Sequence, residues 1–138
     1  MRLIILIILL MVSSNGANKI DKIKQNTEKC LENVIATSAM MECLDIEYTA
    51  RDKELNQTYK KLKKLLNSKT RQALKKAQKQ WIITRDEDMK LIDELYMSPK
   101  FEGSLYRITR YDDIITLTHK RTIFLQRLIN TIAMTTDY

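Results

Sequence analysis

Nine basic side chains and no acidic one occupy residues 60–80 of this 138-residue chain. Ammonium and guanidinium groups bind carboxylates and phosphates through charge-assisted hydrogen bonds. The segment 67–70 reads Asn-Ser-Lys-Thr, which suits the end of one helix and the N-cap of the next. The candidate partner-binding residues near this expected turn are Lys64, Lys69, Arg71 and Lys75. The run therefore predicts recognition of an anionic partner.

The remaining residues offer little for catalysis. The chain has one His, two Gly and no Gly-rich loop, which argues against a Ser/His/Asp triad, a phosphate cradle and a metal site. His119 has no Cys or His at ligand spacing. We predict no catalytic residue, no cofactor and no bound metal, and we expect a protein that is not an enzyme.

Residues 1–17 have the pattern of a secretory signal peptide. Arg2 precedes an unbroken apolar run over residues 3–12, and small or polar residues follow it. The run is too short for a membrane span, which needs about 20 residues. We expect cleavage near Gly16 or Ala17 and one exported domain over residues 18–138, periplasmic or secreted. Because export removes the chain from nucleic acid and no base-reading motif is present, no nucleic-acid partner is expected.

The two cysteines, Cys30 and Cys43, both lie in the exported part. An even number of cysteines in an oxidising compartment predicts a disulfide. This bond would close a short loop and contribute roughly 3 kcal/mol in the chain-entropy treatment. We expect it to tie residues 18–36, a polar segment with room for one short helix, to the first long helix.

Apolar residues recur at steps of three or four through most of the chain, which predicts an all-α fold. Breaks at residues 67–70 and 98–104, the latter containing Pro99 and Gly103, divide the pattern. The prediction is a small antiparallel bundle of three long helices over residues 38–66, 69–97 and 104–134. Arg51, Arg85 and Asp112 interrupt the apolar repeat of the three helices.

Two groups of polar or aromatic residues fall on single helical faces and form a predicted polar core. Asp52 and Asn56 are four residues apart on the first long helix, and Gln78, Trp81 and Arg85 share a face of the second. Asp52 and Arg85 are both about sixteen residues from the turn, so an antiparallel pair of helices would place them level. We expect an Asp52–Arg85 ion pair that fixes helix register; the alternative is a binding or catalytic carboxylate.

Nineteen residues between positions 30 and 125 resemble the LprI-type lysozyme-inhibitor family in order and spacing. The family pattern has two cysteines, an E-Y pair, D-x-x-L-N-x-x-Y, A-Q-x-x-W-x-x-x-R-D, a Gly-Ser pair and T-x-x-R-T-x-x-L. The matching residues are Cys30, Cys43, Glu47, Tyr48, Asp52, Leu55, Asn56, Tyr59, Ala77, Gln78, Trp81, Arg85, Asp86, Gly103, Ser104, Thr118, Arg121, Thr122 and Leu125.

The chain departs from this family at one pair of positions. The family usually has two further cysteines, and this sequence has Met89 and Asp113 in their places. The second disulfide that the resemblance implies, between the second and third long helices, is therefore missing.

The resemblance implies an exported, helical, non-enzymatic protein that binds lysozyme or another cell-wall hydrolase. The expected mechanism is occlusion of the glycan cleft by the basic turn at 67–71 or by the loop at 98–104. Lys69 or Arg71 would pair with the carboxylates of the cleft, although many lysozymes are themselves basic and repel this chain at long range. The alternative is an envelope-associated protein that binds lipopolysaccharide, acidic glycan or lipid headgroups through its basic end without inhibiting an enzyme. The remaining alternative for the basic run is a solvated surface without a partner.

Overall fold

A computed structural model describes residues 21–135 of the chain. The expected signal peptide and cleavage site therefore lie outside the described residues. The described part folds into four helices and no strand: α1 (Lys22–Glu32), α2 (Thr37–Leu65), α3 (Ser68–Tyr96) and α4 (Ser104–Thr135). The all-α prediction is confirmed. The structure has four helices, where the sequence predicted three long helices preceded by a polar segment with room for one short helix.

The helix ends follow from local side-chain chemistry. The Asn67 carboxamide oxygen accepts a hydrogen bond from the Thr70 backbone N–H at 2.9 Å and caps α3, as the sequence predicts. Asp21 caps α1 in the same way, through the Lys24 N–H. Gly103 has φ = 121° just before α4, a backbone conformation that residues other than glycine adopt only with strain. The three long helices begin and end within one residue of their predicted bounds.

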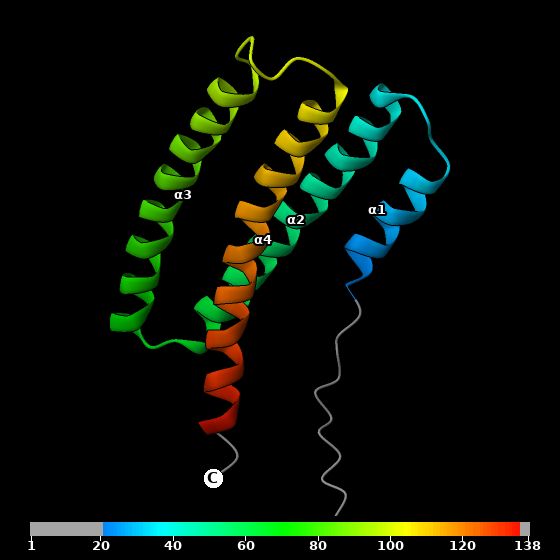
Figure 1. The fold of residues 1–138 in the computed structure, drawn as a ribbon. Helices are drawn as coiled ribbons and strands as arrows, with labels where there is room; N and C mark the ends of the chain where they lie inside the picture. Colours follow the sequence, from blue (N-terminus) through cyan, green and yellow to red (C-terminus); the bar gives the residue numbers. More distant parts are fainter. Residues whose placement is uncertain (1–20, 136–138) are drawn as a thin grey trace, which may run out of the picture.

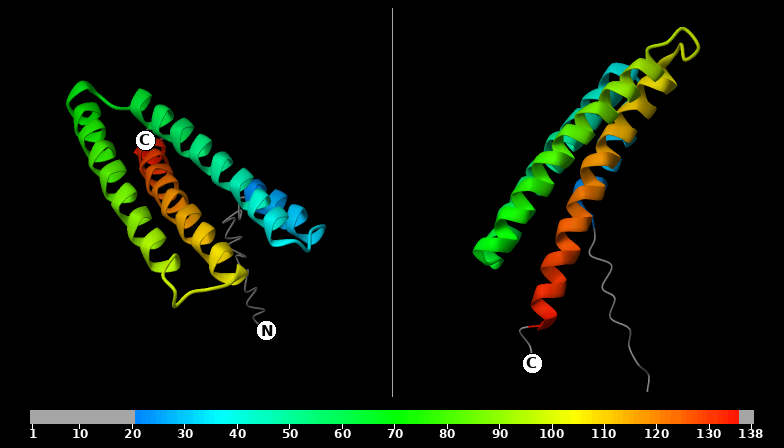
Figure 2. Two further views of the ribbon diagram at one scale, coloured as in Figure 1. Left: turned by 90° about the horizontal axis from the view of Figure 1, so that it is seen from above. Right: turned by 90° about the vertical axis from the view of Figure 1, so that its left-hand side faces the viewer.

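The four helices lie side by side, and α4 occupies the space between α2 and α3 (Figures 1 and 2). The α2–α3 turn lies at one end of the molecule, and the α1–α2 and α3–α4 connections lie at the other (Figure 1). The most extensive interface joins α2 to α4, which run in the same direction, and α1 packs on α2 while α3 packs on α4. The short α2–α3 connection therefore makes α2 and α3 antiparallel, but these two helices do not pack extensively against each other.

The core is built from the faces of α2, α3 and α4 that meet around α4. Leu55, Leu62, Leu74, Leu125 and Ile129 form a buried cluster, and Tyr59, Leu66, Trp81 and Ile132 pack against it. At the other end of α2, the Cys30–Cys43 disulfide joins α1 to α2, with a Cα–Cα distance of 5.9 Å. The predicted disulfide is present, and it holds α1 in place beside α2.

Candidate binding surface

The candidate partner-binding residues lie at the end of the molecule where α2 turns into α3. Lys64 lies in the last turn of α2, and Lys69, Arg71 and Lys75 lie in the first two turns of α3. All four side chains are exposed. Among residues 21–135, none of the basic residues of the 60–80 run takes part in an ion pair. The charge at this end is therefore available to a partner.

Part of this basic end is concave. Lys60, Lys63 and Lys64 of α2 and Arg71 of α3 line a hollow of about 450 Å³. The Arg71 guanidinium donates a hydrogen bond to the Leu66 carbonyl oxygen at 2.9 Å, which holds this side chain across the turn. Four cations around one concave surface, with no acidic residue in its lining, favour an anionic group over a neutral one.

The loop at the other end of the molecule is stabilised by aromatic contacts. Phe101 packs against Tyr96 and Tyr106, with ring centroids 5.7 and 5.0 Å apart. Met97 and Leu105 flank this loop and are largely exposed. The two segments expected to occlude a cleft, 67–71 and 98–104, thus lie at opposite ends of an elongated molecule, and one is basic while the other is flanked by exposed apolar residues (Figure 1).

The predicted ion pair between Asp52 and Arg85 is wrong. The Asp52 carboxylate accepts a hydrogen bond from the Asn56 side chain at 2.9 Å, and Asn56 is exposed. The Arg85 guanidinium pairs with the neighbouring Asp86 at 2.7 Å. Because α4 lies between α2 and α3, equal distance from the turn does not bring these side chains together (Figure 2). Asp52 and Asn56 are not part of a polar core.

Of the three residues grouped on α3, Gln78 and Trp81 contact Arg121 of α4, and Arg85 contacts Trp81. The Arg121 Nε–H of α4 donates to the Gln78 Oε1 atom at 3.0 Å. The Arg85 and Arg121 guanidinium groups both lie over the Trp81 ring, at 5.2 and 5.6 Å from its centroid. Stacking of this kind is worth about 0.5–2 kcal/mol, depending on exposure. These contacts join α3 to α4.

A comparison with protein families identifies the family of the chain. The family model described as lysozyme inhibitor LprI matches residues 29–125. The chain belongs to the LprI family. No curated protein and no solved structure matches the chain.

The LprI match begins within α1, spans α2 and α3 and reaches Leu125 in α4, so it includes most of the core and the basic end. Near Met89 and Asp113, where the resemblance implied a second disulfide, this LprI chain has polar contacts between α3 and α4. The Arg110 guanidinium pairs with Asp93 at 2.7 Å, and the Tyr96 hydroxyl donates to Asp113 at 2.9 Å. The hydrogen bond to Asp113 raises the pKa of Tyr96 above its ordinary value.

Sequence reasoning missed the most buried ion-pair network of this LprI domain. The Arg51 side chain is only 3% exposed and pairs with Asp21 at 2.6 Å, Glu47 at 3.2 Å and Glu54 at 3.3 Å. Burial alone would lower the pKa of Arg51, but hydrogen bonds and charges from Asp21 and Glu47 outweigh burial and raise it. The signal was present: Arg51 interrupts the apolar repeat at a core position between Tyr48 and Leu55.

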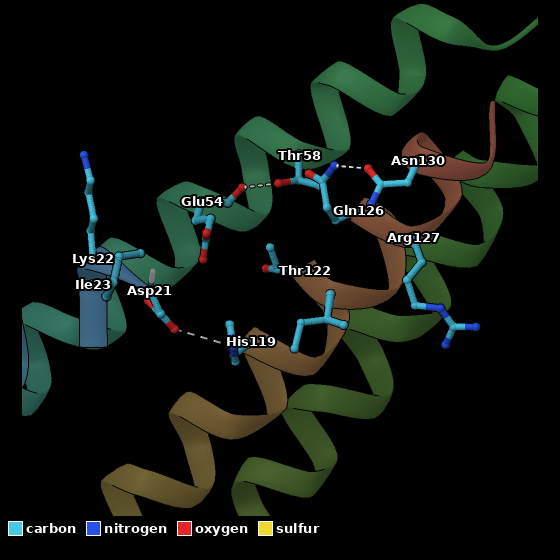
Figure 3. A pocket seen from close by; sticks show the side chains of 11 residues that line it. Asp21, Lys22, Ile23, Glu54, Thr58, His119, Thr122, Gln126, Arg127 and Asn130 are labelled. Atoms are coloured by element: carbon cyan, nitrogen blue, oxygen red, sulfur yellow. Dashed lines mark hydrogen bonds and ion pairs between the residues drawn. The ribbon is translucent and has the colours of Figure 1, made fainter. Parts of the chain in front are cut away.

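A hollow larger than the one at the basic end lies beside this network. Its volume is about 750 Å³, and the start of α1, the middle of α2 and the second half of α4 line it (Figure 3). Asp21 points toward His119, with 3.9 Å between the Asp21 Oδ2 and His119 Nε2 atoms (Figure 3). Acidic and basic side chains both line this hollow, so its charge does not select for an anion as that of the basic end does.

The Asp21 carboxylate predicts a pH dependence of stability. Partial burial would raise the pKa of Asp21, but the Arg51 and Lys24 hydrogen bonds and the nearby charges lower it below 3.8. A carboxylate whose pKa is lower in the folded state than in the unfolded state stabilises the protein at pH values above the unfolded-state pKa. This contribution is lost as the pH falls through the folded-state pKa. In urea unfolding, we expect the stability difference between the native protein and D21N to be present at pH 6 and to shrink as the pH falls below 3.8, the ordinary pKa of an Asp carboxyl. The exposed-site variant D45N is the control, and an equal D21N difference at every pH would contradict the expectation.

Membrane-spanning and metal-binding features are absent from the described part of the chain. No helix within residues 21–135 is long and apolar enough to cross a bilayer. The same residues contain no cluster of His, Cys, Asp and Glu side chains that could hold a metal ion.

Proposed function

We propose that this LprI protein is an exported inhibitor that binds lysozyme, or a related cell-wall hydrolase, with its basic end. Membership of the LprI family is the observation that carries the proposal. The N-terminal segment 1–17 is proposed to direct export and to be removed, leaving residues 18–138 as the exported domain. The protein acts by binding and not by catalysis.

The charge of the basic end supports this choice of contact surface. A lysozyme cleft contains two catalytic carboxylates. Lys69 and Arg71 are exposed, have no ion pair among residues 21–135 and lie in the first turn of α3, directly after the α2–α3 connection. Insertion of this turn into the cleft would pair its cations with the carboxylates and block the glycan. The loop at 98–104 is the less favoured contact because exposed apolar residues flank it.

The proposal predicts a loss of inhibition when the turn is made acidic. We expect the purified exported protein to inhibit lysis of cell walls by lysozyme in a stoichiometric manner. The double variant K69E/R71E should inhibit at least about 100-fold less, because each reversed charge would face a carboxylate. The matched control K100E/R107E makes the same charge change at the opposite end and should inhibit normally.

Several lysozyme types should be assayed, because the inhibitor is expected to distinguish among them. The absence of inhibition by a large excess of folded, helical protein would contradict the proposal. If K100E/R107E abolishes inhibition and K69E/R71E retains it, the contact with lysozyme is the loop at 98–104 and not the basic turn.

The concave group of four cations favours a second candidate function, namely binding of an anionic envelope polymer without inhibition. The salt dependence of binding distinguishes the two functions. Polymer binding through exposed charges weakens steeply as salt screens them. Binding inside a lysozyme cleft is less screened, and salt also relieves the long-range repulsion between two basic proteins. Retention on acidic polysaccharide that falls steeply with salt, without lysozyme inhibition, would favour this second function.

A further inference from the structure

An apolar groove lies between the first half of α3 and the second half of α4, separate from the basic hollow. Its volume is about 410 Å³, within the range of small-molecule sites. Leu62, Leu66, Phe124, Leu128 and Ile132 form much of its wall. Phe124 and Leu128 remain 45% and 37% exposed, so this wall is open to solvent. An open groove of this composition favours an apolar ligand over a polar one.

Two small residues keep the groove open. Ala73 and Ala77 lie one turn apart on α3, and both line it. Their methyl groups are too short to cover the exposed rings and branched chains on α4. The α4 residues that line the groove extend from Arg121 to Ile132, so it is about 16 Å long at 1.5 Å per residue. This length and its narrow, apolar character suit one extended acyl chain.

A cation without a carboxylate partner lies at one end of this groove. Arg121 makes no ion pair among residues 21–135; it donates to Gln78, and its guanidinium lies over the rings of Trp81 and Phe124. Burial lowers the pKa of Arg121, and no nearby acid offsets that effect. An anionic headgroup bound here would supply the missing counter-charge.

Further cations flank the same end of the groove. Lys120 lies one turn before Phe124 on the same face of α4, so it is near the lip at the Arg121 end, and Lys76 lies on α3 at the same level as Ala77. A second copy of this chain is a poor occupant, because two basic 60–80 runs would be brought together. Charge thus selects an anionic occupant for an apolar groove.

We propose that the groove binds the acyl chain of a free single-chain anionic amphiphile, with the headgroup on Arg121. This property is separate from lysozyme inhibition and does not depend on it. The groove, and not the surface of a bilayer, holds the ligand. Binding is expected at one molecule per protein.

Binding of the amphiphile can be measured through the fluorescence of Trp81. It is the only tryptophan of the chain, it packs against the core cluster that contains Leu62 and Leu74, and Arg121 stacks on it. Exported protein is titrated with lauroyl and myristoyl lysophosphatidylglycerol below their critical micelle concentrations. We expect a saturable change in Trp81 fluorescence, and about tenfold tighter binding for the longer chain, since each buried methylene contributes about 0.8 kcal/mol. Myristoyl lysophosphatidylcholine should bind at least tenfold more weakly.

Three variants distinguish binding in the groove from non-specific attraction to the basic surface. A77L fills the groove without changing charge and with little change in helix propensity, and should weaken binding at least tenfold. R121Q should remove the preference for the anionic headgroup. K63Q, which lies in the basic hollow, is the matched control and should bind normally, and circular dichroism should show all three variants to be folded.

Four results would overturn the proposal. They are the absence of saturable binding, equal affinity for the two headgroups, unchanged binding by A77L, and binding to phosphatidylglycerol vesicles without binding to the monomeric lipid. Lysozyme inhibition measured on A77L keeps the two proposals distinct, because this variant should lose the lipid and retain the inhibition.

Discussion

Replacing Arg51 with Met is expected to lower the free energy of unfolding by about 3–5 kcal/mol. Arg51 is 2% exposed and is the common partner of three carboxylates, one at the N-cap of α1 and two from α2. Met preserves much of the side-chain length but leaves Glu47, which is 9% exposed, without its cation. An uncompensated buried charge is the reason for the large effect.

The melting temperature of R51M should fall by about 10–20 °C, measured by circular dichroism. R107M removes an exposed arginine from α4 and should change the melting temperature by little. The double variant R51M/E47Q removes the stranded charge and should recover part of the loss. A melting temperature of R51M equal to that of R107M would show that the network does not stabilise the fold.

The double variant M89C/D113C is expected to form a disulfide between α3 and α4. Asp93 pairs with Arg110 across these helices. Met89 lies one turn before Asp93 and Asp113 about one turn after Arg110, so the two positions are level in an antiparallel pair. The bond would close a loop across the α3–α4 connection and stabilise the protein by about 3 kcal/mol in the chain-entropy treatment.

The oxidised variant should melt about 10 °C above its own reduced form. Comparison of the two redox states controls for the lost Tyr96–Asp113 hydrogen bond. The native disulfide between Cys30 and Cys43 also responds to reductant, so native protein must be measured with and without it and the difference subtracted. The variant M89C/D112C, in which residue 112 is exposed, is the matched control and should not bridge. Free thiols in oxidised M89C/D113C would contradict the expected register of α3 and α4.

Local sequence patterns were sufficient for the helices, the disulfide and the family. A 3.6-residue apolar period, the Asn67 cap and the Pro99–Gly103 break act within a few residues of chain, so they predict helix bounds within one residue. The Cys30–Cys43 bond needed only the count and the compartment. The basic end was also evident, because charge density along residues 60–80 does not depend on packing.

Which helices touch was decided by the tertiary structure alone. The Asp52–Arg85 prediction assumed that helices joined by a short turn pack together, and α4 occupies the space between them (Figure 2). Arg51 finds Asp21 thirty residues away, and Arg121 finds Gln78 forty-three residues away. Such contacts depend on helix packing across the whole domain, which a periodic pattern does not encode because the same apolar stripe fits more than one neighbour. The groove beside Ala73 and Ala77 exists for the same reason: two small residues leave a gap only when a particular face of α4 lies opposite them.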